Sequence, residues 1–196
     1  RSAIYQEFRD CFQDNNRKIL KLCNTRSLFH HSCVTRFLEG WDTIIYFLSE
    51  MVMSEKSKSG EYLLSIMKNV DTKAYFFFKY IFNLFNSFNA FFQAVETRIH
   101  LLHSQSVNFL LQVCKYFLTQ EHLKSPINNI VFSVKENQKA LHDITLGSDC
   151  DEYLHDLMVQ GHIDTVTTVQ ENCLAFYVTA AQEIQKSTSM IYFYQN

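Results

Sequence analysis

An aromatic-rich stretch from Asp71 to His103 constrains the fold of this chain more than any other segment. Its apolar residues recur at steps of three, one and four, which is the spacing of one broad helix face, whereas a half-buried strand would alternate. Phe76 and Phe82 lie off this face and indicate apolar neighbours on more than one side. We therefore predict one long helix over 71–103 in the centre of a bundle, with the phenylalanines of its main face in the core. That face consists of Ala74, Phe77, Phe78, Ile81, Leu84, Phe85, Phe88, Phe91, Phe92, Val95, Ile99 and Leu102.

The composition favours a mainly α fold with one main domain. The chain has 196 residues, 47% of them hydrophobic, and only four Gly and one Pro, so disorder and β-rich turn chemistry are disfavoured. No apolar run reaches the ~18 residues that cross a bilayer, because Lys79, Asn83 and Gln93 interrupt even the aromatic stretch. We expect no membrane partner.

Helical spacing predicts six further helices. Their apolar stripes lie within Ser2 to Asn15, Phe29 to Met53, Tyr62 to Met67, Val107 to Leu118, Cys150 to Met158 and Val166 to Ile184. We expect Ser125-Pro126 to end the helix that contains Val107, and Gly161 to end the helix that contains Cys150. The residues expected to face inward from the last helix are Val169, Cys173, Phe176, Tyr177, Ala180 and Ala181.

Three segments have a less regular pattern. The short apolar run Ile19 to Cys23 suits a strand as well as a helical turn, and we predict a strand. Ile130, Phe132 and Val134 alternate as a short strand would. Ser54 to Gly60 is small, charged and flexible, which predicts an exposed loop.

The cysteine and histidine pattern predicts buried thiols and no metal or cofactor. Six cysteines lie far apart without a C-x-x-C pair, which is typical of reduced intracellular thiols. The cluster His30, His31 and Cys33 and the helix-spaced set Glu96, His100 and His103 are the metal-ligand candidates. Neither has the further ligands that a structural zinc or a four-helix carboxylate site needs, so a satisfied polar patch is the favoured interpretation.

No motif for catalysis is found. The four glycines are isolated, which excludes a phosphate-binding loop. Asp149, Asp151 and Glu152 are the nearest approach to a pair of acid/base carboxylates, but acids in such a segment usually lie at a helix N-terminus, where the helix dipole favours them. Cysteine and histidine match no local nucleophile signature. We therefore predict no catalytic residues and no enzyme, with no small-molecule substrate.

Charge is unevenly distributed although the net charge is only −2. Residues 1–36 hold seven Lys or Arg against three acids, whereas residues 140–183 hold eight acids and no Lys or Arg. The total argues against a surface that coats nucleic acid. The acidic segment is either a solvated face or an acidic docking surface.

Four stretches, taken in order, resemble hAT-superfamily transposases and the host proteins derived from them. The family pattern is a strand, then Thr-Arg-Trp, then a helix with the pattern C-x-x-R-x-L-E-x-W. The matching stretches are Lys18 to Arg26, Cys33 to Asp42, Phe88 to Leu102, and Glu171 to Ala181. The first begins at residue 18 and the last ends at residue 181, so the resemblance extends along most of the chain.

The resemblance implies a large all-helical insertion within an RNase H-like domain. Residues 1–30 would be an edge of that α/β domain and residues 31–196 the insertion. The family's catalytic carboxylates would lie outside a chain that begins at Arg1 without an initiator Met, which we expect to be a fragment or a processed piece. The family's Trp, which is implicated in stacking on a displaced base, is replaced here by Ser27 after Arg26.

These observations predict a non-catalytic, domesticated transposase-derived protein of the nucleus that acts in DNA-associated or protein–protein interaction. Weak DNA contact is expected at Arg17, Lys18, Lys21 and Arg26, and protein partners or a homo-oligomer in the full-length parent. One alternative is part of an active hAT transposase, and another is an unrelated helical scaffold.

Overall fold

The computed structural model describes residues 30–93, 99–126 and 129–195. Every regular element within these ranges is a helix and none is a strand, so the predicted mainly α fold is confirmed. The predicted strand at Ile19 to Cys23 lies outside the described residues. So do residues 1–29, which make up nearly all of the expected RNase H-like edge. The chain divides into two compact units, Arg1–Phe82 and Asn83–Asn196.

The first unit contains four helices in its described part and a core built around one tryptophan. The helices are α2 (His30–Glu39), α3 (Trp41–Glu55), α4 (Lys58–Lys68) and α5 (Val70–Phe77). α3 packs against α4, and α5 contacts both α2 and α4. Trp41 is buried with Ile44, Leu48 and Met67. The rings of Phe37 and Phe76 lie 5.6 and 5.4 Å from the Trp41 ring, centroid to centroid, so aromatic contacts join α2, α3 and α5.

The helix predicted from Phe29 to Met53 is wrong as a single element, because the chain turns at Gly40. This glycine has φ −99° and ψ 14°, outside helical values, and glycine is a poor helix former. The loop predicted from Ser54 to Gly60 is also shorter than expected. Only Lys56 and Ser57 separate α3 from α4: Lys56 ends α3 in the left-handed conformation, and Ser57 Oγ accepts the Gly60 N–H at 3.3 Å as the N-cap of α4.

The single helix predicted over 71–103 is also wrong. α5 ends at Phe77, α6 (Tyr80–Phe92) follows a turn, and α7 begins at Leu102 after the 3₁₀ turn η2 (Ile99–Leu101). At the first break the Lys79 N–H donates to the Phe76 carbonyl oxygen at 3.2 Å, a three-residue spacing that tightens the chain out of the α-helix. The aromatic periodicity continues on both sides of this break. The sequence pattern therefore did not reveal that the helix ends there.

The expected core phenylalanines of this stretch are half-buried. Phe77, Phe85, Phe88 and Phe92 all keep part of their surface exposed, whereas Ala74 and Ile81 on the same predicted face are fully buried. These four rings are therefore less buried than predicted.

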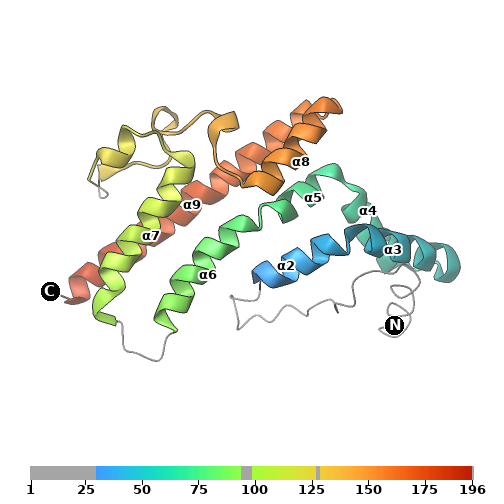
Figure 1. The fold of residues 1–196 in the computed structure, drawn as a ribbon, viewed down its shortest axis with the longest axis horizontal. Helices are drawn as coiled ribbons and strands as arrows, with labels where there is room; N and C mark the ends of the chain where they lie inside the picture. Colours follow the sequence, from blue (N-terminus) through green and yellow to red (C-terminus); the bar gives the residue numbers. More distant parts are fainter. Residues whose placement is uncertain (1–29, 94–98, 127–128, 196) are drawn as a thin grey trace. The chain divides into compact units, whose positions relative to one another are not determined.

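The second unit is organised by α7 (Leu102–Phe117) and α9 (Ile163–Gln195), which lie side by side (Figure 1). α8 (Ser148–Val159) packs on α9 as well. The rings of Phe117 and Tyr177 stack at 5.9 Å and an interplanar angle of 4°, with no exposed surface on either residue. This stack lies in the core of the unit. Its other fully or nearly fully buried members are Leu110, Val113, Cys114, Leu118, Phe132, Leu146, Cys150, Leu154, Leu157, Val166, Val169, Cys173 and Ala181.

The predictions for the last two helices are largely confirmed. Gly161 lies just past α8 with φ +88°, and the His162 N–H reaches back to the Leu157 carbonyl oxygen at 2.9 Å, which ends the helix with a Schellman motif. Along α9 the expected inward residues Val169, Cys173, Tyr177 and Ala181 are buried. The other two are exceptions: Ala180 is only partly buried, and Phe176 has 40% of its surface exposed. None of the described helices combines the length and apolar character needed to span a membrane.

Candidate functional site

The segment between α7 and α8, residues 118–147, carries the candidate site of the second unit and is named the connector here. α7 ends at Phe117 and not at Ser125-Pro126 as predicted, because Leu118 turns to extended backbone with ψ 151°. The described connector contains the short 3₁₀ turns η3 (His122–Lys124), η5 (Lys135–Asn137) and η6 (Leu141–Asp143) and an isolated antiparallel β-bridge between Leu118 and Gln138. The predicted strand at 130–134 is absent from its described part, although Ile130 and Phe132 are buried and Val134 is exposed. Long connections without regular structure often carry function in compact domains.

Hydrogen bonds to main-chain groups fasten the connector to the end of α7 and to α9. The Lys139 N–H donates to the Phe117 carbonyl oxygen at 2.8 Å, and the Thr145 N–H donates to that of Tyr116 at 3.0 Å. On the other side, the Tyr177 hydroxyl donates to the Thr145 carbonyl oxygen at 2.6 Å. The connector is thus held in place by the two helices of the core (Figure 1).

A groove of about 530 Å³ lies between the connector and the outer face of α9. Its α9 wall repeats at helical spacing and comprises Glu171, Leu174, Ala175, Val178 and Thr179. Its connector wall comprises Ser133, Lys135, Gln138, Lys139, Ala140 and Leu141. The volume is within the ~300–1,000 Å³ range of natural ligand sites. We name it the connector groove.

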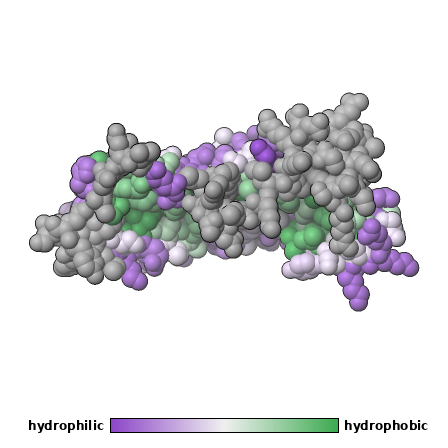
Figure 2. All heavy atoms as spheres, turned by 90° about the horizontal axis from the view of Figure 1, so that it is seen from below, coloured by the Kyte–Doolittle hydropathy of each residue, from purple (hydrophilic) through white to green (hydrophobic). Residues whose placement is uncertain are grey.

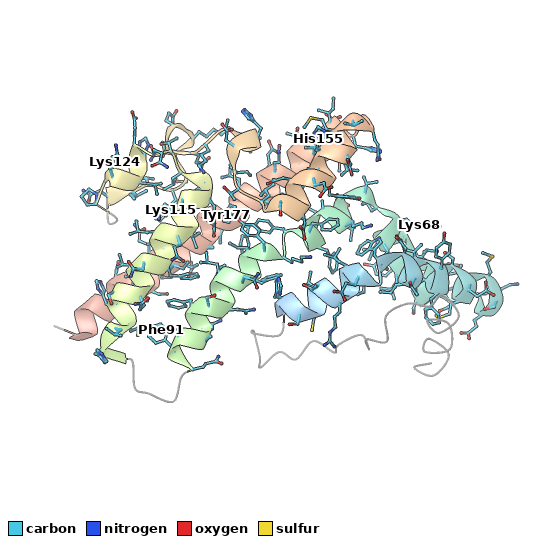
Figure 3. All side chains as sticks on the ribbon, viewed as in Figure 1. Lys68, Phe91, Lys115, Lys124, His155 and Tyr177 are labelled. Carbon is cyan, nitrogen blue, oxygen red and sulfur yellow. The ribbon has the colours of Figure 1, made fainter. Side chains whose placement is uncertain are left out.

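The connector wall is held in shape by its own side chains. Gln138 Nε2 donates to the Phe132 carbonyl oxygen at 2.7 Å. Lys139 Nζ donates to the Lys115 carbonyl oxygen at 2.8 Å, which places a cation at the C-terminal end of α7, where the helix dipole favours it. Lys115 and Tyr177 mark the two helices at this place in Figure 3. These two bonds fix Gln138 and Lys139 in the connector wall.

The groove carries opposite charges on its two walls. Lys135 belongs to the connector wall and Glu171 to the α9 wall, and both side chains are exposed. Among the described residues neither of them forms an ion pair. The lining also includes the apolar residues Leu141, Leu174 and Val178, which we call the floor of the groove.

A second apolar surface lies along α6. Phe88 stacks on Phe109 of α7 with ring centroids 4.4 Å apart, and Phe85 meets the same ring edge-on at 5.1 Å. Hollows of about 290 and 160 Å³ adjoin Phe88 on either side. Figure 2 shows hydrophobic side chains at the surface between hydrophilic ones on the face that it views. The half-buried rings of α6 thus pack within the unit and leave hollows smaller than the connector groove.

The residues predicted to bind DNA, Arg17, Lys18, Lys21 and Arg26, lie outside the described residues. Of the metal-ligand candidates, Glu96 also lies outside, and His100 is exposed. Within the described ranges, no three His, Cys, Asp or Glu side chains come together as a metal site would require.

The acid candidates lie at the start of α8. Asp149 and Asp151 are in its first turn, where the helix dipole favours carboxylates, and both are exposed. Partial desolvation raises the pKa of Asp151. These acids therefore lie at a helix N-terminus, as predicted from the sequence.

Four of the six cysteines are described, and all four are free and buried, as predicted: Cys33, Cys114, Cys150 and Cys173. Burial raises the pKa of Cys114, Cys150 and Cys173 to about 12 each. A thiol acts as a nucleophile or metal ligand through its thiolate, which these three groups do not form near neutral pH. Their geometry makes them packing residues.

Sequence reasoning did not find the connector groove. The available signal was a second apolar stripe on the last helix, Leu174, Ala175 and Val178, displaced from the inward stripe that includes Cys173 and Tyr177. The other wall of the groove comes from the connector, an irregular segment whose path cannot be predicted from hydrophobic periodicity.

Comparisons of the chain with protein-family models, curated proteins and solved structures found no match.

Proposed function

We propose that this chain is a non-catalytic interaction module derived from a hAT transposase, and that it binds a protein partner through the connector groove. The observation that carries the proposal is the groove itself: an apolar lining flanked by Lys135 and Glu171, neither of which forms an ion pair with another described residue. Protein interfaces combine an apolar centre with a polar rim in this way. The hAT origin is supported by the ordered sequence resemblance.

The chemistry of the described residues supports a role without catalysis. The buried thiols of Cys114, Cys150 and Cys173 stay protonated, and the acids of the first α8 turn are exposed to solvent. Burial, with Cys173, Asp151 and Asp149 nearby, raises the pKa of Cys150, which is the opposite of what activates a nucleophilic thiol. A binding role needs only the shape and charge of the groove.

Site-specific photo-cross-linking tests the protein-binding role. A photoreactive phenylalanine analogue at Ala175, on the floor of the groove, should cross-link to a discrete partner in nuclear extract. The same residue at exposed Glu152 of α8 serves as the matched control. Equal labelling at the two positions, or none at Ala175, would contradict binding through the groove.

The proposal includes a weak, local contact with DNA at Arg17, Lys18, Lys21 and Arg26 and a nuclear location. Few phosphates would be neutralised, so log affinity should fall with log salt at ~0.9 per phosphate contact. Binding of a duplex with one unpaired base by wild type and by Arg26→Ala tests the contact. Restoring the family aromatic by Ser27→Trp should strengthen that binding by ~1–3 kcal/mol through base stacking. Metal-dependent nicking of the duplex would overturn the non-catalytic role and favour an active transposase.

A further inference from the structure

We infer that the connector groove takes one amphipathic helix of a partner protein, with an acidic residue of that helix at Lys135. This inference rests on the proposed protein-binding function and names the partner's chemistry. It follows from the length, lining and charge of the groove, taken in turn below.

The dimensions of the groove suit a short helix. Its α9 wall runs from Glu171 to Thr179, eight residues apart, which is about 12 Å at 1.5 Å per residue. That distance corresponds to roughly two turns of a helix lying alongside. Ala175 lies in the middle of the wall, and its small side chain lets a neighbouring backbone or a Leu side chain approach α9 closely.

The lining selects apolar side chains at helical spacing. Leu174, Val178 and Leu141 form the floor and would be covered by residues at positions i, i+3 or i+4, and i+7 of the partner helix. At about 530 Å³ the groove has room for several such side chains. It is an open groove rather than an enclosed cavity, which favours a segment that passes through over a small molecule held on all sides.

The charges fix which helix fits. Lys139 Nζ is already bonded to the Lys115 carbonyl oxygen, whereas Lys135 has no side-chain partner in the described part of the chain. A partner carboxylate would pair with Lys135. Glu171 on the opposite wall disfavours a second acid there and favours a neutral or basic flank. Nucleic acid is a poor occupant, because the lining offers a single lysine without a side-chain partner among the described residues, and Glu171 faces it from the other wall.

Two synthetic peptides test the inference. Both are blocked 14-residue helix formers with Leu at i, i+4 and i+7; one carries Glu on one flank of the Leu stripe, and its twin carries Gln at the same places. Their affinities for the full chain are measured by fluorescence anisotropy. We expect saturable binding of both peptides and tighter binding of the Glu peptide.

Variants locate the binding. Lys135→Glu should weaken the Glu peptide about three- to tenfold, because an exposed attraction becomes a repulsion, and should change the Gln twin less than about twofold. Lys124→Glu makes the same charge change on the connector outside the groove and should leave both affinities unchanged. Ala175→Trp fills the floor and should abolish binding of both peptides, whereas Thr167→Trp on exposed α9 surface should not.

Three outcomes would overturn the inference: no saturable binding of either peptide, undiminished binding to Ala175→Trp, or equal effects of Lys135→Glu and Lys124→Glu. Its failure is distinguishable from failure of the proposed function. Cross-linking at Ala175 without peptide binding keeps the protein-binding role and overturns the helical occupant. Peptide binding without cross-linking keeps the helix groove and overturns the role in nuclear extract.

Discussion

The hydroxyl of Tyr177 donates a 2.6 Å hydrogen bond to the carbonyl oxygen of Thr145, 32 residues earlier in the chain. Tyr177 belongs to α9 and has no exposed surface, whereas Thr145 belongs to the irregular connector. One side chain therefore both fills the core, through its stack on Phe117, and anchors the segment that forms a wall of the groove.

Tyr177→Phe should separate these two roles. The ring and its stacking remain, but the hydrogen bond is lost, so the free energy of unfolding should fall by about 0.5–1.5 kcal/mol. Urea unfolding measures the loss. Tyr62→Phe is the control, since Tyr62 is 68% exposed and should change stability by less than about 0.5 kcal/mol. Equal effects of the two substitutions would mean that the Tyr177 bond contributes nothing.

Phe117→Ala and Phe85→Ala should differ in cost. Phe117 is fully buried, and its removal should cost about 3–5 kcal/mol of unfolding free energy. Phe85 is half-buried against Phe109 and Phe176, so its loss should cost less, about 1.5–3 kcal/mol. Chemical denaturation of both variants gives the two values. A larger loss at Phe85 than at Phe117 would place the centre of the core at α6 instead of at the α7–α9 contact.

Alkaline pH should destabilise the folded chain through its buried thiols. In the unfolded chain these thiols ionise above their ordinary pKa of 9.0, but burial holds the folded pKa of Cys114, Cys150 and Cys173 at about 12. Their contribution is therefore complete below pH 9.0 and is lost as the pH rises from 9.0 toward about 12, at ~1.4 kcal/mol per pH unit for each thiol.

Cys173→Ala isolates this effect, because one thiol fewer should reduce the slope of unfolding free energy against pH by about one proton. Unfolding under reducing conditions at several pH values between 8 and 11 measures the slope. The same thiols should resist iodoacetamide at neutral pH until the chain unfolds. An unchanged slope, or rapid alkylation of Cys114, Cys150 or Cys173 in the native chain as located by peptide mapping, would contradict the assigned burial.

Gly161→Ala should destabilise the chain through the backbone alone. The position has φ +88°, and a Cβ there would meet no atom within 4 Å, so the cost comes from the left-handed conformation and not from a clash. We expect a loss of about 1 kcal/mol in thermal or urea unfolding. Gly161→Asn should lose less, because asparagine tolerates this conformation better. If alanine and asparagine had the same effect, backbone conformation would not be the cause.

Helical periodicity predicted best where one apolar stripe faces one core. It located α7, α8 and most of α9, because Val169, Cys173 and Tyr177 recur on a single face. It failed at Phe78 and Lys79, where aromatic residues continue on both sides of the turn and no glycine or proline marks it. At Gly40 a marker was present, but the apolar pattern on both sides concealed the break.

The candidate site was beyond such reasoning for a physical reason. The groove has Lys135 on one wall and Glu171 on the other. The first wall comes from the irregular connector and the second from the outer face of α9. Periodicity reports which residues of one element share a face, but it carries no information on where a loop held by main-chain hydrogen bonds will lie. The acidic bias of 140–183 was the only sign that charge matters in this region.

The way in which the connector is anchored also affects how freely its sequence can change. Gln138, Lys139 and Tyr177 hold it through their side chains, but three further bonds join main-chain groups: Lys139 N–H to Phe117 O, Thr145 N–H to Tyr116 O and Thr119 N–H to Asn137 O. Any residue except proline can supply such a donor. The exposed side chains of this wall, such as Lys135, can therefore be exchanged one at a time while the backbone keeps its path. A scaffold of this kind can acquire a new binding preference by surface substitution, without rebuilding its interior.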